Sequence, residues 1–328
     1  VLWKTDGRRW TAGRAPATAA NVPVAGEVPI DYELILEPTG EYWLFGLDLV
    51  TDLPAGTRLN HNFALVGNQR INKRFTYRAS SDPHYRMQSL SMRERQLGLQ
   101  LPEQVSPRLR QLVSQWQSET DPQQPLQLVR RALAHFSEQP FVYTLSPGSL
   151  NSADPIDQFL FETRRGFCEH YAGSFALLMR LAGIPSRIVL GYQGGEKNPH
   201  ADHWLIRQSD AHAWNEVWIP ELGWWRVDPT AAVAPERVEQ SINSARSLDA
   251  GQVVFQVGSG GLISDLWREA AWLADAVDLG WHSWVVGFST ERQDSLLDLF
   301  GLGGLNGLGL ALAMLVGSGL AAGCVFLM

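Results

Sequence analysis

The stretch from residue 166 to residue 230 constrains the fold most, because the spacing of its apolar residues changes from helical to alternating. Apolar side chains three and four apart predict a helix that begins near Cys168 and is ended by Gly183 and Pro185. The turn at Pro220–Gly223 joins the last two strands of the pattern that follows. Strands are expected at 186–192, 203–208, 213–219 and 224–227. A helix followed by consecutive strands indicates an α+β fold.

The rest of the chain divides into segments of different pattern. Residues 1–115 predict a β-rich N-terminal domain with a helical connector, and residues 116–235 predict the core that holds the stretch above. Residues 236–300 predict a loop and then a helical region at 262–288. Further strands are expected at 32–36, 41–50, 58–66 and 73–78, and further helices at 106–116, 125–136 and 154–163.

The C-terminal run from Gly301 to Met328 holds no charged residue. Since roughly 20 apolar residues span a bilayer, the sequence predicts a truncated transmembrane segment over 301–328, with a buried core helix as the alternative. The flank before this run is poor in Lys and Arg, which favours an extracytoplasmic position for the residues ahead of it. The chain begins without Met or a signal peptide, so we expect it to be part of a longer protein.

Charge and cysteine content narrow the possible functions. The formal net charge is -7 and there is no long basic run, which argues against a nucleic-acid partner. The chain has 2 cysteines, and Cys324 lies in the charge-free run, so we expect no disulfide with Cys168. A single cysteine in a polar motif with histidines downstream is a candidate nucleophile.

Cys168 is predicted to open its helix, where unpaired backbone amides and the positive end of the helix dipole favour the thiolate. The thiolate is the nucleophilic form of cysteine. Gly166 is expected to let the chain turn sharply into this helix. An inert buried cysteine is the alternative interpretation of the position.

His212 is the preferred candidate base among 8 histidines, because it lies at the mouth of a predicted strand downstream of Cys168. His170 is only two residues from the cysteine on the same helix and points off its face. Asp228 ends the partner strand, and Pro229 keeps it extended. If the two strands pair, His212 and Asp228 meet at one edge, where the carboxylate would fix the imidazole tautomer. An aspartate that closes a turn before proline is the alternative.

Three ordered segments carry a specific resemblance. They are Gly166-Phe167-Cys168-Glu169-His170-Tyr171-Ala172, Ala211-His212-Ala213-Trp214-Asn215-Glu216-Val217-Trp218 and Gly223-Trp224-Trp225-Arg226-Val227-Asp228-Pro229-Thr230. In order and spacing they resemble the three motifs of the transglutaminase-like superfamily, which has a papain-like thiol fold. A papain-type protease places its histidine much further downstream. The β-rich start, the segment 281–285 and the final apolar run are similar to TgpA-type bacterial membrane-anchored transglutaminases.

The resemblance implies a catalytic triad of Cys168, His212 and Asp228, with the cysteine-bearing helix packed on an antiparallel sheet. It also implies that Cys168 attacks a glutamine γ-amide and passes the acyl group to an amine, forming an isopeptide bond. The implied partners are a glutamine-bearing protein or peptide, an amine acceptor and membrane lipid around residues 301–328. No cofactor is implied, and calcium dependence is left open. The catalytic domain would lie in the periplasm, anchored to the bacterial inner membrane.

Several further residues are candidates for the same site. Gln158 and the Cys168 backbone amide are candidate oxyanion donors. Aromatic walls exclude water around a thioester, and the candidate cleft residues are Trp204, Trp214 and Trp224. Ordinary strand packing accounts for these tryptophans equally well.

Two other functions stay open at this point. A cysteine peptidase or amidase acting on envelope protein or cell wall would use the same triad, and a non-catalytic envelope scaffold would keep only the fold. A metal site is a third possibility, although the spacing of its candidate residues fits no familiar ligand pattern. Those residues are Glu196, Asp202 and His203.

Overall fold

The computed structural model describes six stretches of the chain: 3–5, 10–12, 29–60, 63–85, 89–235 and 262–281. The chain forms two compact units, the first made of residues 1–195 and 206–252 and the second of residues 196–205 and 253–328. The fold is mixed helix and sheet, as expected. The predicted boundaries near residues 115 and 235 remain predictions.

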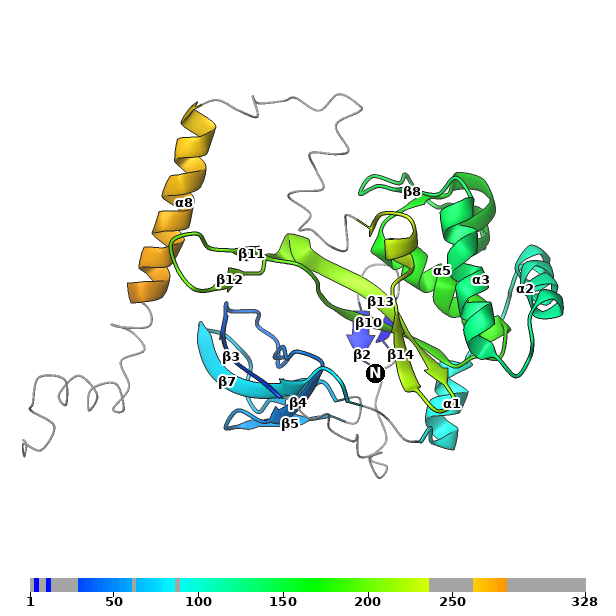
Figure 1. Ribbon diagram of the computed structural model, residues 1–328, viewed down its shortest axis with the longest axis horizontal. Coiled ribbons are helices and arrows are strands. Elements are labelled where there is room, and N and C mark those ends of the chain that lie inside the picture. The colour runs from blue at the N-terminus through cyan, green and yellow to red at the C-terminus, as the bar shows by residue number, and fades with distance from the viewer. Residues whose placement is uncertain are drawn as a thin grey trace, which may run out of the picture. The chain divides into compact units, whose positions relative to one another are not determined.

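Strands dominate the first unit up to residue 85. The antiparallel sheet β3–β7–β4 comprises β3 (Ile30–Leu36), β7 (Phe75–Asp82) and β4 (Leu49–Asp52). Two further antiparallel pairs are β1 (Trp3–Thr5) with β2 (Trp10–Ala12), and β5 (Thr57–Leu59) with β6 (Leu65–Gly67). Their arrangement can be followed in Figure 1. Alternate apolar residues of β7, such as Tyr77 and Ala79, are buried in the core of this part.

The strand expected over 41–50 is wrong for most of its length. Trp43 forms one isolated bridge with Val66, and regular pairing begins only at β4. At Phe45 the strand is interrupted by Tyr77, whose hydroxyl accepts a hydrogen bond from the Phe45 amide at 2.9 Å and donates one to the Phe45 carbonyl at 2.8 Å. This side chain therefore satisfies the two backbone groups of Phe45 that a ladder would otherwise use.

The single strand expected over 58–66 is also wrong, because the chain turns between β5 and β6. The Asn60 side chain accepts a hydrogen bond from the Ala64 amide at 3.0 Å, and Phe63 adopts a left-handed backbone with φ 61°. Asparagine favours turns because its side chain mimics a backbone acceptor. The sequence pattern of alternating apolar residues did not account for this turn.

Three helices connect the β-rich part to the rest of the first unit. They are α1 (Met92–Gly98), α2 (Pro107–Glu119) and α3 (Pro125–Glu138). Proline at the first position of α2 and α3 costs no hydrogen bond, since that amide has no partner inside a helix. Their apolar residues recur at helical spacing, so each helix buries one face; the buried residues are Leu109, Val113, Trp116, Leu128, Val129, Ala132 and Phe136.

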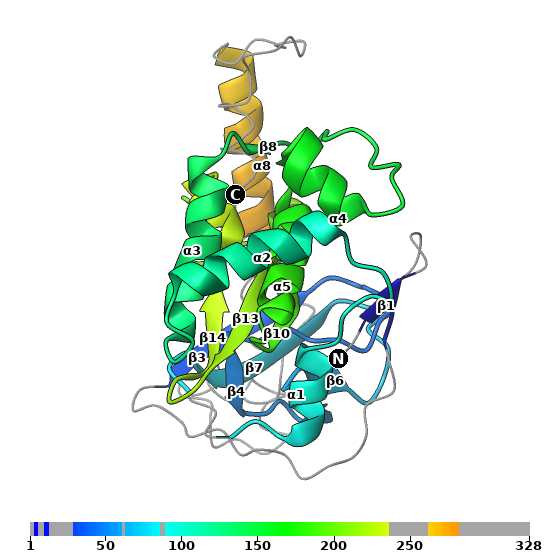
Figure 2. The same ribbon diagram turned by 90° about the vertical axis from the view of Figure 1, so that its right-hand side faces the viewer.

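The helix expected near Cys168 is α5 (Cys168–Leu181), and the strands expected after it form a three-stranded antiparallel sheet in the order β10–β13–β14. The strands are β10 (Ser186–Tyr192), β13 (Ala211–Ile219) and β14 (Gly223–Val227). Helix α5 lies between this sheet and the pair α2 and α3, as Figures 1 and 2 show. The predicted packing of this helix on an antiparallel sheet is thus present.

A short irregular segment leads into α5. It contains β8 (Val142–Tyr143), α4 (Pro155–Gln158), the π-helical turn η1 (Phe159–Thr163) and β9 (Arg165–Gly166). The turn ends at Arg164, which has a left-handed backbone with φ 51°, and β9 then pairs in parallel with β8. π-Helical turns are rare and are often found next to functional sites.

The strand expected at 203–208 is shorter than predicted. The second unit holds β11 (Glu196–Lys197) paired with β12 (Trp204–Leu205), whereas residues Gln208–Asp210 form the 3₁₀ turn η2 in the first unit. The Asp210 carboxylate accepts a hydrogen bond from the Arg207 amide at 2.8 Å and so stabilises this turn.

The predicted C-terminal helix corresponds to α8 (Leu262–Trp281), whose side chains are described for residues 269–278. Among the described helices, none combines the length and apolar character that crossing a membrane requires. The transmembrane segment predicted at 301–328 lies outside the described residues.

Candidate active site

Cys168 occupies the first position of α5 and is buried. Phe167 precedes it with an extended backbone (φ -117°, ψ -177°), and its amide donates to Nδ1 of His170 at 3.4 Å. His170 therefore turns back to cap the start of the helix. Burial lowers the pKa of His170, which keeps the ring neutral and able to accept this bond.

Gly166 is required for a reason other than the predicted sharp turn. A Cβ atom there would lie 2.7 Å from Cβ of His170 and 2.8 Å from the Phe159 ring. Since such contacts are far too short for carbon atoms, only glycine lets η1 and α5 approach this closely. The start of the helix is thereby held against the preceding segment.

His212 and Asp228 meet at the edge of the β13–β14 hairpin. Nε2 of His212 lies 2.6 Å from Oδ2 of Asp228, and the imidazole is almost fully buried. At its open end the β13–β14 pairing stops with Asn215 opposite Val227. Asp228 follows Val227, and His212 lies three residues before Asn215, so the two residues lie diagonally across this end of the hairpin. The other ring nitrogen, Nδ1, is buried without a formed hydrogen bond in the part of the chain that the structure describes.

Asp228 uses both of its carboxylate oxygens. Oδ2 faces His212, and Oδ1 accepts a hydrogen bond from the Thr230 amide at 3.0 Å. It thus caps the 3₁₀ turn η3 (Pro229–Ala232), with the extended backbone that Pro229 was expected to impose (φ -111°, ψ 100°). The turn-closing interpretation is therefore present, and the same side chain also contacts His212. The triad assignment of Asp228 stays a prediction.

The imidazole of His212 is poised to carry a proton. Burial, the largest single influence, lowers its pKa, but the hydrogen bond to the Asp228 carboxylate and the nearby Asp228 and Cys168 groups together raise the pKa above its ordinary value of 6.5. With Nε2 engaged by the carboxylate, Nδ1 is the nitrogen left to exchange a proton with the thiol. Catalytic hydrogen bonds are often long in the absence of substrate.

Trp214 covers the buried histidine. Its ring stacks near the His212 imidazole, with centroids 6.2 Å apart and planes inclined by 21°, and the Arg226 guanidinium lies 4.4 Å from its centroid. A Cβ atom on Gly191 would lie 2.7 Å from the indole, so the indole fits only over a glycine of the neighbouring strand. Trp214 therefore lies beside the imidazole, whose side chain is fully buried.

Known proteins are similar to this chain over the region that carries these residues. A family model described as the transglutaminase-like superfamily matches residues 111–229, and a model of the TgpA N-terminal domain matches residues 1–88. The crystal structure of the periplasmic domain of TgpA from Pseudomonas aeruginosa superposes with a TM-score of 0.68 and 43% identity, covering 74% of this chain and 86% of that one. This chain belongs to the TgpA branch of the transglutaminase-like superfamily.

Two curated relatives are also similar to this chain. A protein-glutamine gamma-glutamyltransferase of Pseudomonas aeruginosa is 40% identical over 337 residues, which cover 98% of this chain. The uncharacterized protein YebA of Bacillus subtilis is 33% identical over 138 residues, which cover 40% of this chain and 18% of that protein. The present chain spans about half of the Pseudomonas relative, 49% of its length.

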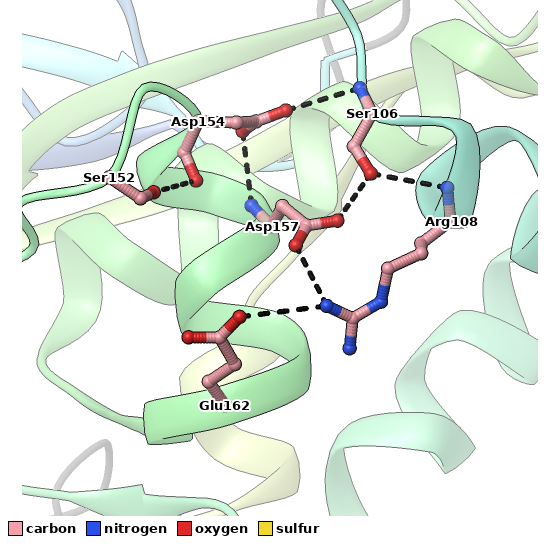
Figure 3. Close-up of polar contacts among 6 residues, drawn as sticks. All are labelled: Ser106, Arg108, Ser152, Asp154, Asp157 and Glu162. Carbon is pink, nitrogen blue, oxygen red and sulfur yellow. Dashed lines mark hydrogen bonds and ion pairs between the residues drawn. The ribbon is translucent and has the colours of Figure 1, made fainter.

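Within this transglutaminase-like core, Figure 3 shows how the segment that precedes Cys168 is held. Asp157 of α4 accepts hydrogen bonds from the Ser106 hydroxyl and, at 3.1 Å, from the Arg108 guanidinium, while Asp154 accepts from the Ser106 amide at 3.2 Å. Asp154 also caps α4 through the Asp157 amide at 3.0 Å. Two carboxylates therefore join the start of α4 to the start of α2.

The predicted oxyanion donor Gln158 lies at the end of α4. Its Oε1 accepts a hydrogen bond from the Ser152 amide at 3.2 Å, which leaves Nε2 as the group available to a substrate oxygen. The Cys168 amide, as the first of a helix, has no intrahelical acceptor. Both assignments remain predictions.

The three predicted cleft tryptophans have different positions. Trp214 lies beside His212, as described above. Trp224 pairs with Trp218 next to the turn of the hairpin, where the Arg187 guanidinium covers its ring at 4.3 Å, so it lies toward the opposite end of β14 from Asp228. Trp204 belongs to the second unit and is 64% exposed.

Two of the three polar residues considered for a metal, Asp202 and His203, are engaged in ion pairs. Asp202 lies 3.0 Å from the Lys197 ammonium, and His203 Nε2 lies 2.7 Å from Asp275 of α8. No cluster of three metal-binding side chains occurs among the described residues. His170 and Arg226 contact the site, yet sequence reasoning gave them no such role. Their only signal was their position inside the three motifs.

Proposed function

We propose that this chain is the catalytic part of a protein-glutamine gamma-glutamyltransferase, working through a thioester on Cys168. The observation that carries the proposal is the 2.6 Å contact of His212 Nε2 with Asp228 beside a buried free cysteine at a helix start. The motif order, the family membership and the activity named for the Pseudomonas relative support it.

The first half of the proposed reaction forms the thioester. The Cys168 thiolate attacks the γ-carboxamide carbon of a glutamine side chain, and a tetrahedral oxyanion forms. The protonated Nδ1 of His212 then gives its proton to the leaving nitrogen, the carbon–nitrogen bond breaks and ammonia departs. Asp228 accepts the hydrogen bond from Nε2–H throughout, which holds the ring in the required tautomer and stabilises the imidazolium.

The second half transfers the acyl group. A primary amine, such as a lysine side chain, attacks the thioester carbon while Nδ1 of His212 removes a proton from it. The carbon–sulfur bond breaks, the isopeptide product leaves, and the Cys168 thiolate with its imidazolium is regenerated. Water is the competing nucleophile, and the indole of Trp214 against His212 reduces its access.

Two donors are proposed for the oxyanion. The Cys168 amide is unpaired within its helix, and the Gln158 Nε2 group is left to donate because Oε1 takes the bond from the Ser152 amide. The network in Figure 3 holds α4, which carries Gln158, against the start of α2. Each donor of this kind contributes on the order of 10²–10³-fold in turnover. Substitution of Gln158 by Glu keeps the bond to Ser152 but removes the donor.

The activity is tested with a glutamine-containing peptide and the full chain. Ammonia release together with incorporation of a labelled primary amine is expected, and Cys168→Ala is expected to abolish both. Ammonia release without amine incorporation would indicate a hydrolase, and cleavage of the peptide backbone would indicate a peptidase. Either result would contradict the proposed transfer.

We extend the proposal to location. The solved relative is described as a periplasmic domain, and residues 301–328 are charge-free, so a periplasmic catalytic domain with a membrane anchor at 301–328 fits both. A chain ending at Glu291 is expected in the soluble fraction, and the full chain in the membrane fraction. Protease added to spheroplasts should cleave the catalytic domain without lysis, whereas protection until lysis would contradict the periplasmic location.

A further inference from the structure

Asn215 is a buried polar residue on an otherwise apolar strand face. It shares the α5-facing side of β13 with Ala213, Val217 and Ile219, all of them buried. Its own exposure is 0%. Alternation along a strand predicts an apolar residue at this position, and burying an amide among apolar groups is unfavourable unless each polar atom is hydrogen-bonded.

The amide of Asn215 is only half satisfied. Nδ2 donates a hydrogen bond to the Ala172 carbonyl at 3.0 Å, whereas Oδ1 is buried without a partner among the described residues. An unpaired buried oxygen opposes folding, and an apolar side chain of similar shape would remove that cost. The residue therefore does not serve stability, and its one formed bond must account for its presence.

That bond joins the two elements that carry the reacting groups. Ala172 lies one turn beyond Cys168 on α5, and Asn215 lies three residues beyond His212 on β13. Between them Cys168, Ala172 and Ala213 pack as a small cluster, so the helix approaches the strand closely at this point. At the end of the helix that carries Cys168, where small side chains pack against the strand, this bond adds a directional contact between the two elements.

We infer that Asn215 is a positioning residue, which aligns the Cys168 thiol with Nδ1 of His212 at the expense of stability. The catalytic effect of this residue rests on the proposed acyl transfer, whereas the contact between α5 and β13 is independent of it. A displacement of about 1 Å between reacting groups lowers turnover by on the order of 10²-fold. Substrate binding is unaffected, because Asn215 is covered by α5.

The test compares Asn215→Leu with Val217→Ala, a buried residue two positions along the same face. Asn215→Leu is expected to keep or raise the melting temperature while kcat falls at least about tenfold and KM stays unchanged. Val217→Ala is expected to lower the melting temperature through a cavity and to keep kcat. If Asn215→Leu does not fold, Asn215→Ala is measured in the same way.

A second readout needs no acyl donor. The rate at which iodoacetamide alkylates Cys168 below neutral pH reports the thiolate held by His212, and it should fall in the Asn215 variants but not in Val217→Ala. The inference would be overturned if the Asn215 variants kept the alkylation rate and kcat of the native chain. Equal losses of both quantities in Val217→Ala would also overturn it. Fast alkylation of the native chain without acyl transfer would instead count against the proposed function alone.

Discussion

Two histidines of this chain face an aspartate at nearly the same distance in very different surroundings. His212 lies 2.6 Å from Asp228, with side chains 0% and 10% exposed, whereas His203 lies 2.7 Å from Asp275, with side chains 20% and 30% exposed. The first pair also interacts with the Cys168 thiol. The second joins the β11–β12 hairpin to α8, where Asn198 donates to the same Asp275 carboxylate at 2.8 Å.

The comparison shows that nearly the same imidazole–carboxylate distance occurs in two very different surroundings. Burial and a third group beside the free ring nitrogen distinguish His212 from His203. A further histidine shows what burial does to the pKa when no described carboxylate pairs with the ring. His135 is packed among aromatic rings, and its Nε2 is buried without a partner in the described part of the chain. Burial, with the nearby charges of Arg131 and Arg164, lowers the pKa of His135 to about 4. A carboxylate partner reverses this effect at His212.

The largest expected effect is a difference in turnover between variants of the two aspartates, Asp228 and Asp275. Asp228→Asn should lower turnover by on the order of 10²–10⁴-fold, because the new amide donates to Nε2 and forces the proton onto Nδ1. The Asn oxygen still accepts from Thr230, so the η3 turn and the melting temperature should be preserved. Asp275→Asn is the matched control and should leave turnover unchanged. Equal losses in both variants would contradict the assignment of Asp228.

The pH dependence of stability should differ in sign between two buried histidines. Since the pKa of His135 is lowered in the folded state, the unfolded state binds more protons, and stability is lost as pH falls from 6.5 through about 4. The full shift corresponds to about 3 kcal/mol, which partial exposure reduces to about 1–2 kcal/mol. Chemical denaturation across this range should show a loss in His135→Phe that is smaller than the loss in the native chain by this amount, since His170, whose pKa is also lowered, contributes to both. A parallel loss in His135→Phe would assign it to other groups.

His212 should behave in the opposite way. Its pKa is raised in the folded state, so its stabilising contribution is complete below pH 6.5 and is lost as pH rises through the folded value. The difference in unfolding free energy between the native chain and His212→Asn should therefore shrink above pH 6.5. Denaturation curves of both proteins on either side of neutrality measure it, and a difference that grows with pH would contradict the raised pKa.

The smallest effect is expected at the exposed pair of His200 and Glu269, which lie 2.8 Å apart with side chains 38% and 59% exposed. Exposed ion pairs contribute about 0–1 kcal/mol. Glu269→Gln should change the unfolding free energy by less than about 1 kcal/mol, and the change should vanish in high salt. A larger effect that persists in salt would show that exposure is a poor guide to the strength of these pairs.

Local sequence signals were sufficient for the elements that form the site. Apolar spacing located α5 and the three strands, and the turn at 220–223 with proline after Asp228 predicted the edge where His212 and Asp228 now lie 2.6 Å apart. The position of this turn also argues against Trp224 as a residue of the cleft beside His212. A residue next to the turn of a hairpin lies far from the open end, where Asp228 is found.

Contacts between distant segments were not readable from the sequence. The Tyr77 hydroxyl that replaces a ladder at Phe45, and the close approach of Phe159 to Gly166, depend on packing of the folded chain. The bond from Asn215 to Ala172 is of the same kind, since its partners are 43 residues apart. Periodicity reports which face of an element is buried, but not which atom it meets.

The most direct test of the central claim is to trap the acyl-enzyme. The full chain is mixed with a glutamine-containing peptide at acid pH without an amine, digested, and analysed by mass spectrometry. The account predicts a thioester of the peptide, with loss of one ammonia, on the fragment that contains Cys168, and its disappearance when a primary amine is added. An unmodified Cys168 fragment, or an adduct that persists in Cys168→Ala, would contradict it.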